Sequence, residues 1–248
     1  MKALFDLGNS RLKWALSGDG IRGIGSIESH DASTLSSDLE AVLGKTKSPG
    51  QAWISSVAGD DTTGELVGWL NRKWSIDAHL VKASADAYGV INSYVQPETL
   101  GSDRWAALIA VRHRYSQPAT IIDCGTATTI DFLDGNRFYG GVILPGLQLS
   151  RSSLVRNTAK LQLENTETIS SIATSTSAGI QSGTLLGLAG GIEHITKQQQ
   201  QETGQSSKVY LTGGSAYRIL PYLALASEVE VVDDLVLQGI EVIAELEA

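Results

Sequence analysis

The sequence predicts an α/β protein made of two similar lobes, residues 1–116 and 117–248. Two observations lead to this prediction. Runs with the two-residue period of β-strands alternate with runs of helical period along the chain, as in α/β lobes. The stretch of residues 3–10 also returns at residues 120–127, so that Asp123 follows Asp6 by 117 positions (123 minus 6). Such a repeat indicates a duplicated unit, although an Asp-x-Gly sequence after a strand can also recur by chance.

Length and composition describe a globular protein that needs no cross-links. A chain of 248 residues can bury enough surface to fold without a disulfide or a structural metal. The single cysteine, Cys124, excludes an internal disulfide, and four scattered histidines disfavour a zinc site. A reducing, cytoplasmic location is therefore expected. The net charge of -8 and the lack of a basic run disfavour a nucleic-acid partner.

The sequence predicts neither a signal peptide nor a membrane span. Asp6 interrupts the first apolar run before a signal core could form. The most membrane-like stretch, residues 178–192, is too short to cross a bilayer and carries Gln181, so no membrane partner is expected. Small residues recur in this stretch near helical spacing, which favours a helix packed closely on another surface, such as a second subunit. These residues are Gly179, Gly183, Gly187 and Gly190.

The first lobe is predicted to open with two strands joined by a tight turn. Residues 3–7 and 12–16 are short β-favouring runs, and Gly8-Asn9 between them supports positive φ. Asp19-Gly20 then predicts a hairpin turn into a third strand, residues 21–27. The later predicted elements are a helix over 35–43, a strand over 53–57, a helix over 63–74, a strand over 76–81 and a helix from 101 to about 115.

The second lobe is predicted to begin at the break Ser116-Gln117-Pro118, because proline ends the preceding helix. A strand from residue 120, a turn and a second run ending at Asp134-Gly135 repeat the opening of the chain. Residues 212–215 are a Gly-Gly turn where a nucleotide's adenosine could lie, a weak signal by itself. The later predicted elements are a helix over 183–201, a strand over 209–211, a helix after the Gly-Gly turn, a strand over 228–232 and a helix over 235–246.

The two Asp-x-Gly turns are candidate phosphate sites. Backbone N–H groups that point into one concavity bind phosphate oxygens, and glycine permits the close approach. Asp6 and Asp123 would then hold the cations that accompany a polyphosphate. The alternative is that both are hairpins with purely structural aspartates. Hydroxyl groups that could add donors are those of Ser10, Thr126, Thr128 and Thr129.

Lys13 is a second candidate phosphate contact. It follows Ser10 by three residues on the predicted second strand, where alternation places it on the same face as Arg11. An ammonium there could reach a phosphate as a point charge. The alternative, a solvated lysine at a sheet edge, is equally compatible with the sequence.

The helix that follows Gly101 carries a candidate general base. Ser102 and Asp103 could simply cap the helix and complement its dipole. Arg104 does not fit that explanation, because a cation in the first turn opposes the dipole. A carboxylate and a guanidinium together suit an anionic, hydroxyl-bearing substrate. Asp103 would accept a proton, and Arg104 would bind the acidic end of the substrate or orient Asp103.

Six motifs occur in an order that resembles one family. They are Asp6-Leu7-Gly8-Asn9-Ser10, Gly101-Ser102-Asp103-Arg104, Asp123-Cys124-Gly125-Thr126-Ala127-Thr128-Thr129, Gly140-Gly141-Val142-Ile143-Leu144-Pro145-Gly146, Thr212-Gly213-Gly214 and Leu235-Val236-Leu237-Gln238-Gly239. Together they are similar to the motifs of type III pantothenate kinases, also known as the Bvg accessory factor family. The resemblance spans essentially the whole chain.

The resemblance implies two ribonuclease-H-like lobes of the sugar kinase/Hsp70/actin superfamily, with ATP in the cleft between them. It implies that Asp103 accepts the proton of the primary hydroxyl of pantothenate, in a pocket lined by Tyr94 and residues 101–104. It also implies that Asp123 ligates potassium or ammonium, alongside magnesium. Thr176 matches a threonine that contacts substrate across the interface of a homodimer. The residues that would wrap the ATP phosphates are Asp6, Leu7, Gly8, Asn9, Ser10, Arg11, Leu12 and Lys13, with Thr126 opposite.

The chain departs from the family pattern at two positions. Ser10 stands where threonine is more usual and keeps the hydroxyl group. Ser175 precedes Thr176 where asparagine is usual. Neither change removes a group that the chemistry needs.

The activity expected from this resemblance is phosphorylation of pantothenate by ATP, giving 4′-phosphopantothenate, the first step of coenzyme A biosynthesis. Two alternatives stay open at the level of sequence. One is a kinase of the same superfamily with another small-molecule acceptor, and the other is a nucleotide-binding accessory or regulatory protein of the same fold.

Overall fold

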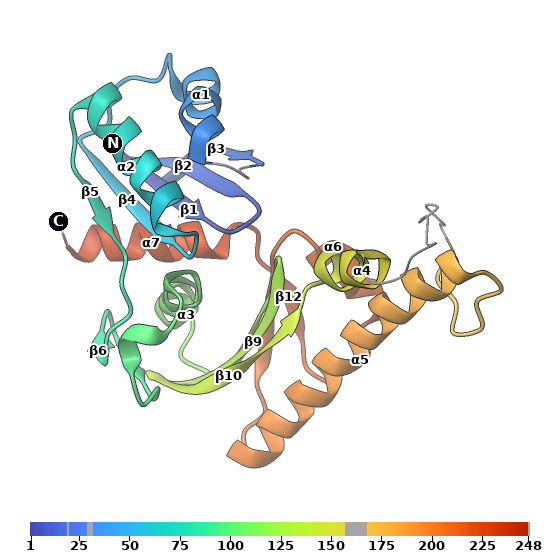
Figure 1. Ribbon diagram of the computed structural model, residues 1–248. Helices are drawn as coiled ribbons and strands as arrows, with labels where there is room; N and C mark the ends of the chain where they lie inside the picture. Colours follow the sequence, from blue (N-terminus) through green and yellow to red (C-terminus); the bar gives the residue numbers. More distant parts are fainter. Residues whose placement is uncertain (19, 29–31, 157–167, 248) are drawn as a thin grey trace. The chain divides into compact units, whose positions relative to one another are not determined.

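The computed structural model describes residues 1–18, 20–28, 32–156 and 168–247, and it packs as two units (Figure 1). The first unit contains residues 1–116, 136–138 and 234–248. The second contains residues 117–135 and 139–233. Among the helices described, none is both long enough and apolar enough to cross a membrane.

The first unit is built on a five-stranded sheet with the order β3-β2-β1-β4-β5. The first strand pairs antiparallel with β2 and parallel with β4. The five strands are β1 (Lys2–Leu7), β2 (Leu12–Gly18), β3 (Gly20–Ile27), β4 (Gln51–Ser56) and β5 (Ala78–Leu80).

Helices cover both faces of this sheet. Helices α1 (Ala32–Leu43) and α2 (Asp60–Trp74) pack on the face that carries Phe5 and Leu12, where they form a buried apolar core with Leu39 and Leu70. The other face carries Lys2, Asp6, Lys13 and Ser17, because side chains alternate along each strand. Helix α7 (Leu235–Leu246) lies against it, and α7 in turn packs on α3 (Ser102–Arg114).

A short segment completes the first unit. Strands β6 (Asp86–Ala87) and β7 (Val90–Asn92) form a two-stranded hairpin, and a 3₁₀ turn spans Pro97–Thr99. The strand β7 also pairs in parallel with Arg137 and Phe138, which open β10 (Arg137–Pro145).

The second unit repeats the topology of the first. Five strands of its sheet are adjacent in the order β12-β11-β8-β9-β10, after which the sheet continues with β7 and β6. Strand β8 pairs antiparallel with β9 and parallel with β11. Reversed, this order is the same as that of the first sheet. The elements are β8 (Ala119–Cys124), β9 (Ala127–Asp134), β11 (Lys208–Thr212), β12 (Val229–Val231), α4 (Leu147–Arg156), α5 (Thr176–Thr203), α6 (Ala216–Ile219) and a 3₁₀ turn (Leu220–Tyr222).

The shared topology explains the repeated opening motif. Asp6 is the penultimate residue of β1 and lies opposite Lys13 on β2 and Ser55 on β4. Asp123 is the penultimate residue of β8 and lies opposite Thr129 on β9 and Thr212 on β11. Each aspartate therefore occupies the same place in its own sheet, and the α/β prediction with two similar units is confirmed.

Several boundaries differ from those predicted. Helix α5 begins at Thr176 rather than near Gly183, and α6 has only four residues before the turn that contains Pro221. Arg11 lies in the turn before β2 rather than on a strand face with Lys13. Asp19 lies outside the described residues, but Gly20 after it has the positive φ of 97° that a tight turn requires.

The extent of the second lobe also differs from the predicted residues 117–248. The break at residues 116 and 117 coincides with a boundary between the two units, but residues 136–138 and 234–248 pack with the first unit. Residues 137 and 138 pair with β7, and residues 234–248 join the first unit through the close packing of α7 on α3. A Cβ atom at Gly239 would lie 1.9 Å from the Ala106 carbonyl oxygen, so the two helix backbones meet where glycine leaves room.

Candidate active site

The first predicted phosphate turn is a compact hairpin between β1 and β2. Leu7 and Leu12 pair across its base and are fully buried, which anchors the two ends. The Gly8 backbone N–H donates a 3.0 Å hydrogen bond to the Arg11 carbonyl oxygen. A Cβ atom at Gly8 would lie only 3.2 Å from that oxygen, which favours glycine. The turn presents Asn9 and Ser10, and neither side chain is buried.

Lys13 emerges from β2 directly opposite Asp6, so the two side chains share one face of the sheet. Its ammonium group lies 3.0 Å from Asp234 Oδ1, at the start of α7. The side chains of Lys13 and Asp234 are only 25% and 20% exposed. The interpretation of Lys13 as a solvated edge lysine is therefore wrong. Arg11 is more exposed, and its guanidinium lies 3.5 Å from Glu28 Oε1.

Asp103 lies in the first turn of α3, where Arg104 and Gly101 define its environment. Its Oδ1 atom accepts a 2.7 Å hydrogen bond from the Arg104 backbone N–H. Burial raises the pKa of the Asp103 carboxyl group above its ordinary value, and the charge and hydrogen bond of Arg104 oppose this only partly. A Cβ atom at Gly101 would lie 2.6 Å from Oδ1, so glycine leaves the space that the carboxylate occupies.

The predicted substrate residues Tyr94 and Arg104 are brought together. Arg104 is 7% exposed, and its Nη1 atom donates a 2.9 Å hydrogen bond to the Tyr94 hydroxyl oxygen. The guanidinium also lies 5.7 Å from the Tyr94 ring centre and 5.9 Å from that of Phe138. These contacts hold a buried cation among polarisable groups. The Ser102 hydroxyl forms a 2.9 Å hydrogen bond with the hydroxyl of Ser55.

The second predicted phosphate turn lies between β8 and β9 and is closed by two glycines from elsewhere in the unit. The Gly146 N–H donates a 3.0 Å hydrogen bond to the Thr126 carbonyl oxygen. A Cβ atom at Gly146 would lie 2.3 Å from the Gly125 carbonyl oxygen. Gly213, with a φ of 90°, approaches Asp123 Oδ1 so closely that a Cβ atom would lie 2.3 Å from it. The turn thus presents an exposed Thr126 beside a partly buried Asp123.

Cys124 takes no part in nucleophilic chemistry. The thiol is fully buried, and burial together with the charge of Asp123 raises its pKa to about 12. It is therefore protonated at neutral pH and packs as a small apolar group in the core of the second unit.

Thr176 is the first residue of α5. Ser175 before it is the N-cap, and its hydroxyl oxygen accepts a 3.2 Å hydrogen bond from the Ala178 N–H. Serine at this position therefore fulfils the capping role for which asparagine is also suited. The predicted small residues of α5 are exposed, and a Cβ atom on any of them would meet nothing within 4 Å. They are Gly179, Gly183, Gly187 and Gly190.

The carboxylates suit magnesium in a shared complex rather than a protein-only cage. Within the described residues, no group of three or more His, Cys, Asp or Glu side chains is arranged to hold a metal ion. Mg²⁺ commonly takes one or two carboxylates and fills its shell with water and substrate phosphates. Asp6, beside the first predicted phosphate turn, carries a carboxylate of the required kind.

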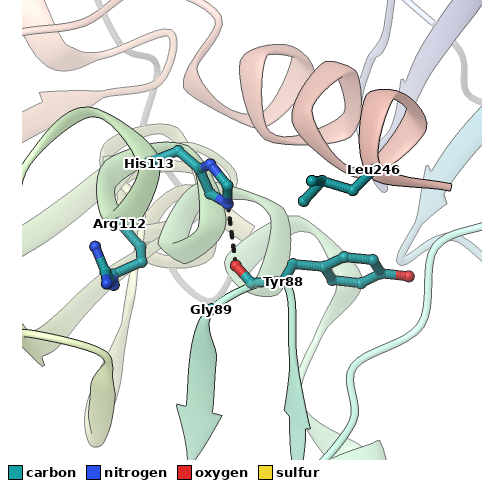
Figure 2. Close-up of a pocket in the computed structure, with 5 residues that line it drawn as sticks. All are labelled: Tyr88, Gly89, Arg112, His113 and Leu246. Atoms are coloured by element: carbon teal, nitrogen blue, oxygen red, sulfur yellow. Dashed lines mark hydrogen bonds between the residues drawn. The ribbon is translucent and has the colours of Figure 1, made fainter. Parts of the chain in front are cut away.

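A pocket of about 360 Å³ lies in the first unit, away from these motifs (Figure 2). It is lined by Tyr88, Gly89, Arg112, His113 and Leu246. His113 Nε2 donates a 3.1 Å hydrogen bond to the Tyr88 carbonyl oxygen, whereas the Arg112 side chain points away from Leu246. Arg112 and Asp103 are nine residues apart on α3, which corresponds to about 14 Å along the helix. The pocket is therefore distinct from the predicted substrate site.

Three residues that contact the predicted site residues were not identified from the sequence. Asp234 binds Lys13 from a position 221 residues further along the chain, and Phe138 packs on Tyr94 and Arg104. Gly146 closes the second phosphate turn. Only Gly146 had a signal, since it ends a recognised motif, but nothing in its local sequence indicates which turn it contacts.

Comparison with known proteins identifies relatives of the chain. The family described as type III pantothenate kinase matches residues 3–198. A type III pantothenate kinase from Nitrosococcus oceani is 36% identical over 254 aligned positions, which cover 98% of this chain and 94% of that protein.

Solved structures share the fold at low sequence identity. The activator of 2-hydroxyisocaproyl-CoA dehydratase from Clostridium difficile, with bound ADPNP, aligns with a TM-score of 0.56 at 15% identity, over 99% of this chain and 94% of that one. An inorganic polyphosphate/ATP-glucomannokinase from Arthrobacter sp. strain KM aligns with a TM-score of 0.51 at 12% identity, over 99% of this chain and 98% of that one. The fold is therefore that of the sugar kinase and actin-like ATPase proteins.

Proposed function

The chain belongs to the type III pantothenate kinase family, and from that premise we propose that Asp103 is the general base of its reaction. The activity itself follows from the family: ATP-dependent phosphorylation of pantothenate in the biosynthesis of coenzyme A. The proposal concerns the residues of this chain that carry out the transfer. The environment of Asp103 at the start of α3 is the observation that supports it.

In the proposed reaction, the oxygen of the primary hydroxyl of pantothenate attacks the γ-phosphorus of ATP. A new O–P bond forms as the bond between this phosphorus and the bridging oxygen of ADP breaks. The hydroxyl proton passes to the Asp103 carboxylate. Most of the rate enhancement comes from positioning and charge neutralisation, and general base catalysis contributes about 10²–10⁴-fold.

The surroundings of Asp103 suit a proton acceptor. Burial raises the pKa of its carboxyl group, which brings its basicity closer to the range useful near neutral pH. The Arg104 N–H donates a hydrogen bond to Oδ1, and the absence of a Cβ atom at Gly101 leaves room for the carboxylate in this position. The second carboxylate oxygen would accept the proton.

Arg104 and Tyr94 are proposed to recognise pantothenate. Pantothenate carries a carboxylate, and a guanidinium is the side chain best suited to bind such a group through two hydrogen bonds. The 2.9 Å bond to the Tyr94 hydroxyl and the packing on Phe138 fix the direction of the Arg104 side chain. Gly101 and Ser102 complete the proposed pocket.

The phosphates of ATP are proposed to lie against the first turn, residues 6–13, with Thr126 contributing from the second. The Gly8 N–H is bonded to the Arg11 carbonyl oxygen, so the backbone amides proposed to bind phosphate are those that follow Gly8 in the turn, and Lys13 supplies a positive charge. When bound, Mg²⁺ would neutralise the developing charge on the phosphate oxygens, with Asp6 as its carboxylate partner. Asp123 is proposed to ligate a potassium or ammonium ion.

The enzyme is proposed to act as a cytoplasmic homodimer in which Thr176 contacts substrate across the interface. The support is the exposed row of glycines along α5, since a helix surface without side chains allows a second helix to approach closely. Sedimentation would test the dimer.

An ADP-release assay with and without potassium or ammonium would test the proposal that Asp123 ligates one of these ions, because activity independent of both ions contradicts it.

Asp103→Asn tests the central proposal. Asparagine keeps an oxygen that can accept from the Arg104 N–H, so folding and ATP binding should be retained. The pantothenate-dependent release of ADP should fall by about 10²–10⁴-fold, because the amide cannot accept the proton. Ser33→Ala, a substitution at an exposed residue of α1, serves as the control. A normal turnover number in the Asp103→Asn enzyme would remove Asp103 from the mechanism.

A further inference from the structure

Asp234 is the residue that holds Lys13, and its backbone conformation is unusual. Its φ of 54° and ψ of 35° place it in the left-handed region, which few residues other than glycine adopt. Only three non-glycine residues in the described part of the chain have positive φ. Such a conformation costs free energy and persists where the surrounding structure imposes it, which makes a functional explanation worth seeking.

Capping of α7 does not explain this residue. Asp234 occupies the N-cap position, and its carbonyl oxygen accepts a 3.1 Å hydrogen bond from the Gln238 N–H. Aspartate at this position normally uses its side chain to accept from the first turn of the helix. Here the side chain makes no such bond, and Oδ1 lies instead 3.0 Å from the Lys13 ammonium. The Asp234 carboxylate therefore binds Lys13 and does not cap α7.

Attachment of α7 to the sheet does not require the pair either. Ser17 Oγ donates a 2.6 Å hydrogen bond to Glu241 Oε1, and Lys2 Nζ donates to the Ala244 carbonyl oxygen. Both contacts join α7 to the same sheet face as Lys13. The apolar residues of α7, among them Leu235 and Leu237, are also buried. The helix is therefore held independently of Asp234.

The ion pair between Lys13 and Asp234 is suited to hold the flexible lysine side chain in one position. Lysine has four rotatable bonds, and holding it in one conformation costs conformational entropy. Asp234 stands at the first turn of a helix that is packed tightly on α3 through Gly239, so its own position is rigid. With both side chains three-quarters or more buried, solvent screens the interaction less than it screens a surface pair.

We propose that Asp234 is a positioning residue for the phosphoryl transfer: it holds the Lys13 ammonium beside Asp6 and the first phosphate turn, ready to contact the transferring group. This inference rests on the proposed role of Lys13 in phosphate binding. In this proposal Asp234 acts only through Lys13 and is not itself a ligand of substrate or metal. Its contribution is the geometry of a charge that acts in the transition state.

The adjacent aspartate provides a matched control. Asp233 carries the same charge one residue earlier, and its Oδ2 atom accepts a 3.0 Å hydrogen bond from the hydroxyl of Tyr217, which is 63% exposed. Asp233→Asn and Asp234→Asn therefore change the net charge equally at neighbouring positions. Only the second removes the anionic partner of Lys13.

The experiment compares kcat, KM for each substrate and the melting temperature of Asp234→Asn, Asp233→Asn, Lys13→Met and the double variant Lys13→Met/Asp234→Asn. We expect Asp234→Asn to lower kcat about tenfold, because misplacement of a charge by a fraction of an ångström is costly. The KM for pantothenate and the melting temperature should change little. Asp233→Asn should retain wild-type kinetics. In the Lys13→Met background, Asp234→Asn should cause no further loss, since both changes remove the same interaction.

Distinct results would overturn the inference. An unchanged kcat in Asp234→Asn, with a large loss in Lys13→Met, would reject Asp234 as a positioning residue while leaving the role of Lys13 intact. A fall in melting temperature with normal kcat would assign the pair a structural role. An equal loss in both backgrounds would show that Asp234 acts through another group. Normal kinetics in Lys13→Met would reject the phosphate role of Lys13 and this inference with it.

A second variant covers the case in which Asp234→Asn does not fold. Glycine adopts a φ of 54° without strain, so Asp234→Gly removes the carboxylate while keeping the backbone. It should show the same fall in kcat. If Asp234→Gly is folded and fully active, the proposal is wrong.

Discussion

Replacement of Gly101 by alanine should slow catalysis without unfolding the protein. A Cβ atom at this position would lie 2.6 Å from Asp103 Oδ1, whereas ordinary contacts of this kind begin near 3.4 Å. The carboxylate must therefore move by about 0.8 Å (3.4 minus 2.6). The backbone of Gly101, with φ of -55° and ψ of 137°, is accessible to alanine, so the chain itself is not strained.

The expected effect is on kcat rather than on the binding of ATP. A misplacement close to 1 Å can lower a rate by up to about 10²-fold, so we expect a 10- to 100-fold fall in kcat. This is smaller than the loss expected for Asp103→Asn, because the base is moved and not removed. Steady-state release of ADP at saturating pantothenate measures the change, and thermal unfolding reports whether the fold is retained.

Gly64→Ala is the matched control for this substitution. Gly64 lies within α2, and a Cβ atom there would meet nothing within 4 Å. Alanine should stabilise the helix by about 0.5–1 kcal/mol and leave the kinetics unchanged. A Gly101→Ala enzyme with wild-type kcat would refute the reasoning, because it would show that the position of the Asp103 carboxylate does not limit the transfer.

Two further predictions concern pH and packing. A general base must be deprotonated, so kcat/KM should fall as the pH drops through the pKa of Asp103, which burial raises above the ordinary value of 3.8. This fall at low pH should be absent from the residual activity of Asp103→Asn. If it persists in that variant, another group is responsible for it. Gly239→Ala should lower the free energy of unfolding by about 1–3 kcal/mol, since its Cβ atom would lie 1.9 Å from the Ala106 carbonyl oxygen. Urea unfolding measures this change. An unchanged midpoint would contradict the close packing of α7 on α3.

The sequence alone determined the features that depend on local pattern. The closing helix was predicted over 235–246, the span that α7 occupies, because its apolar residues recur at helical spacing. The two phosphate turns were predicted from Asp-x-Gly after a strand, and the shared topology of the two sheets confirms the duplication. Local pattern was weaker where propensities conflict. The helix predicted over 183–201 omitted the first turns of α5, which begins at Thr176, and Pro221 shortened the helix after the Gly-Gly turn.

Tertiary structure alone decided which distant residues meet. Lys13 could be read as a solvated edge residue until Asp234, distant in the chain, was found beside its ammonium group. In the same way, α7 packs with the first unit because glycine at position 239 lets it approach α3, and Phe138 reaches Arg104 only through the pairing of β10 with β7. The sequence gives the chemical groups of each residue. Which groups meet depends on how distant segments pack, and local periodicity does not determine that packing.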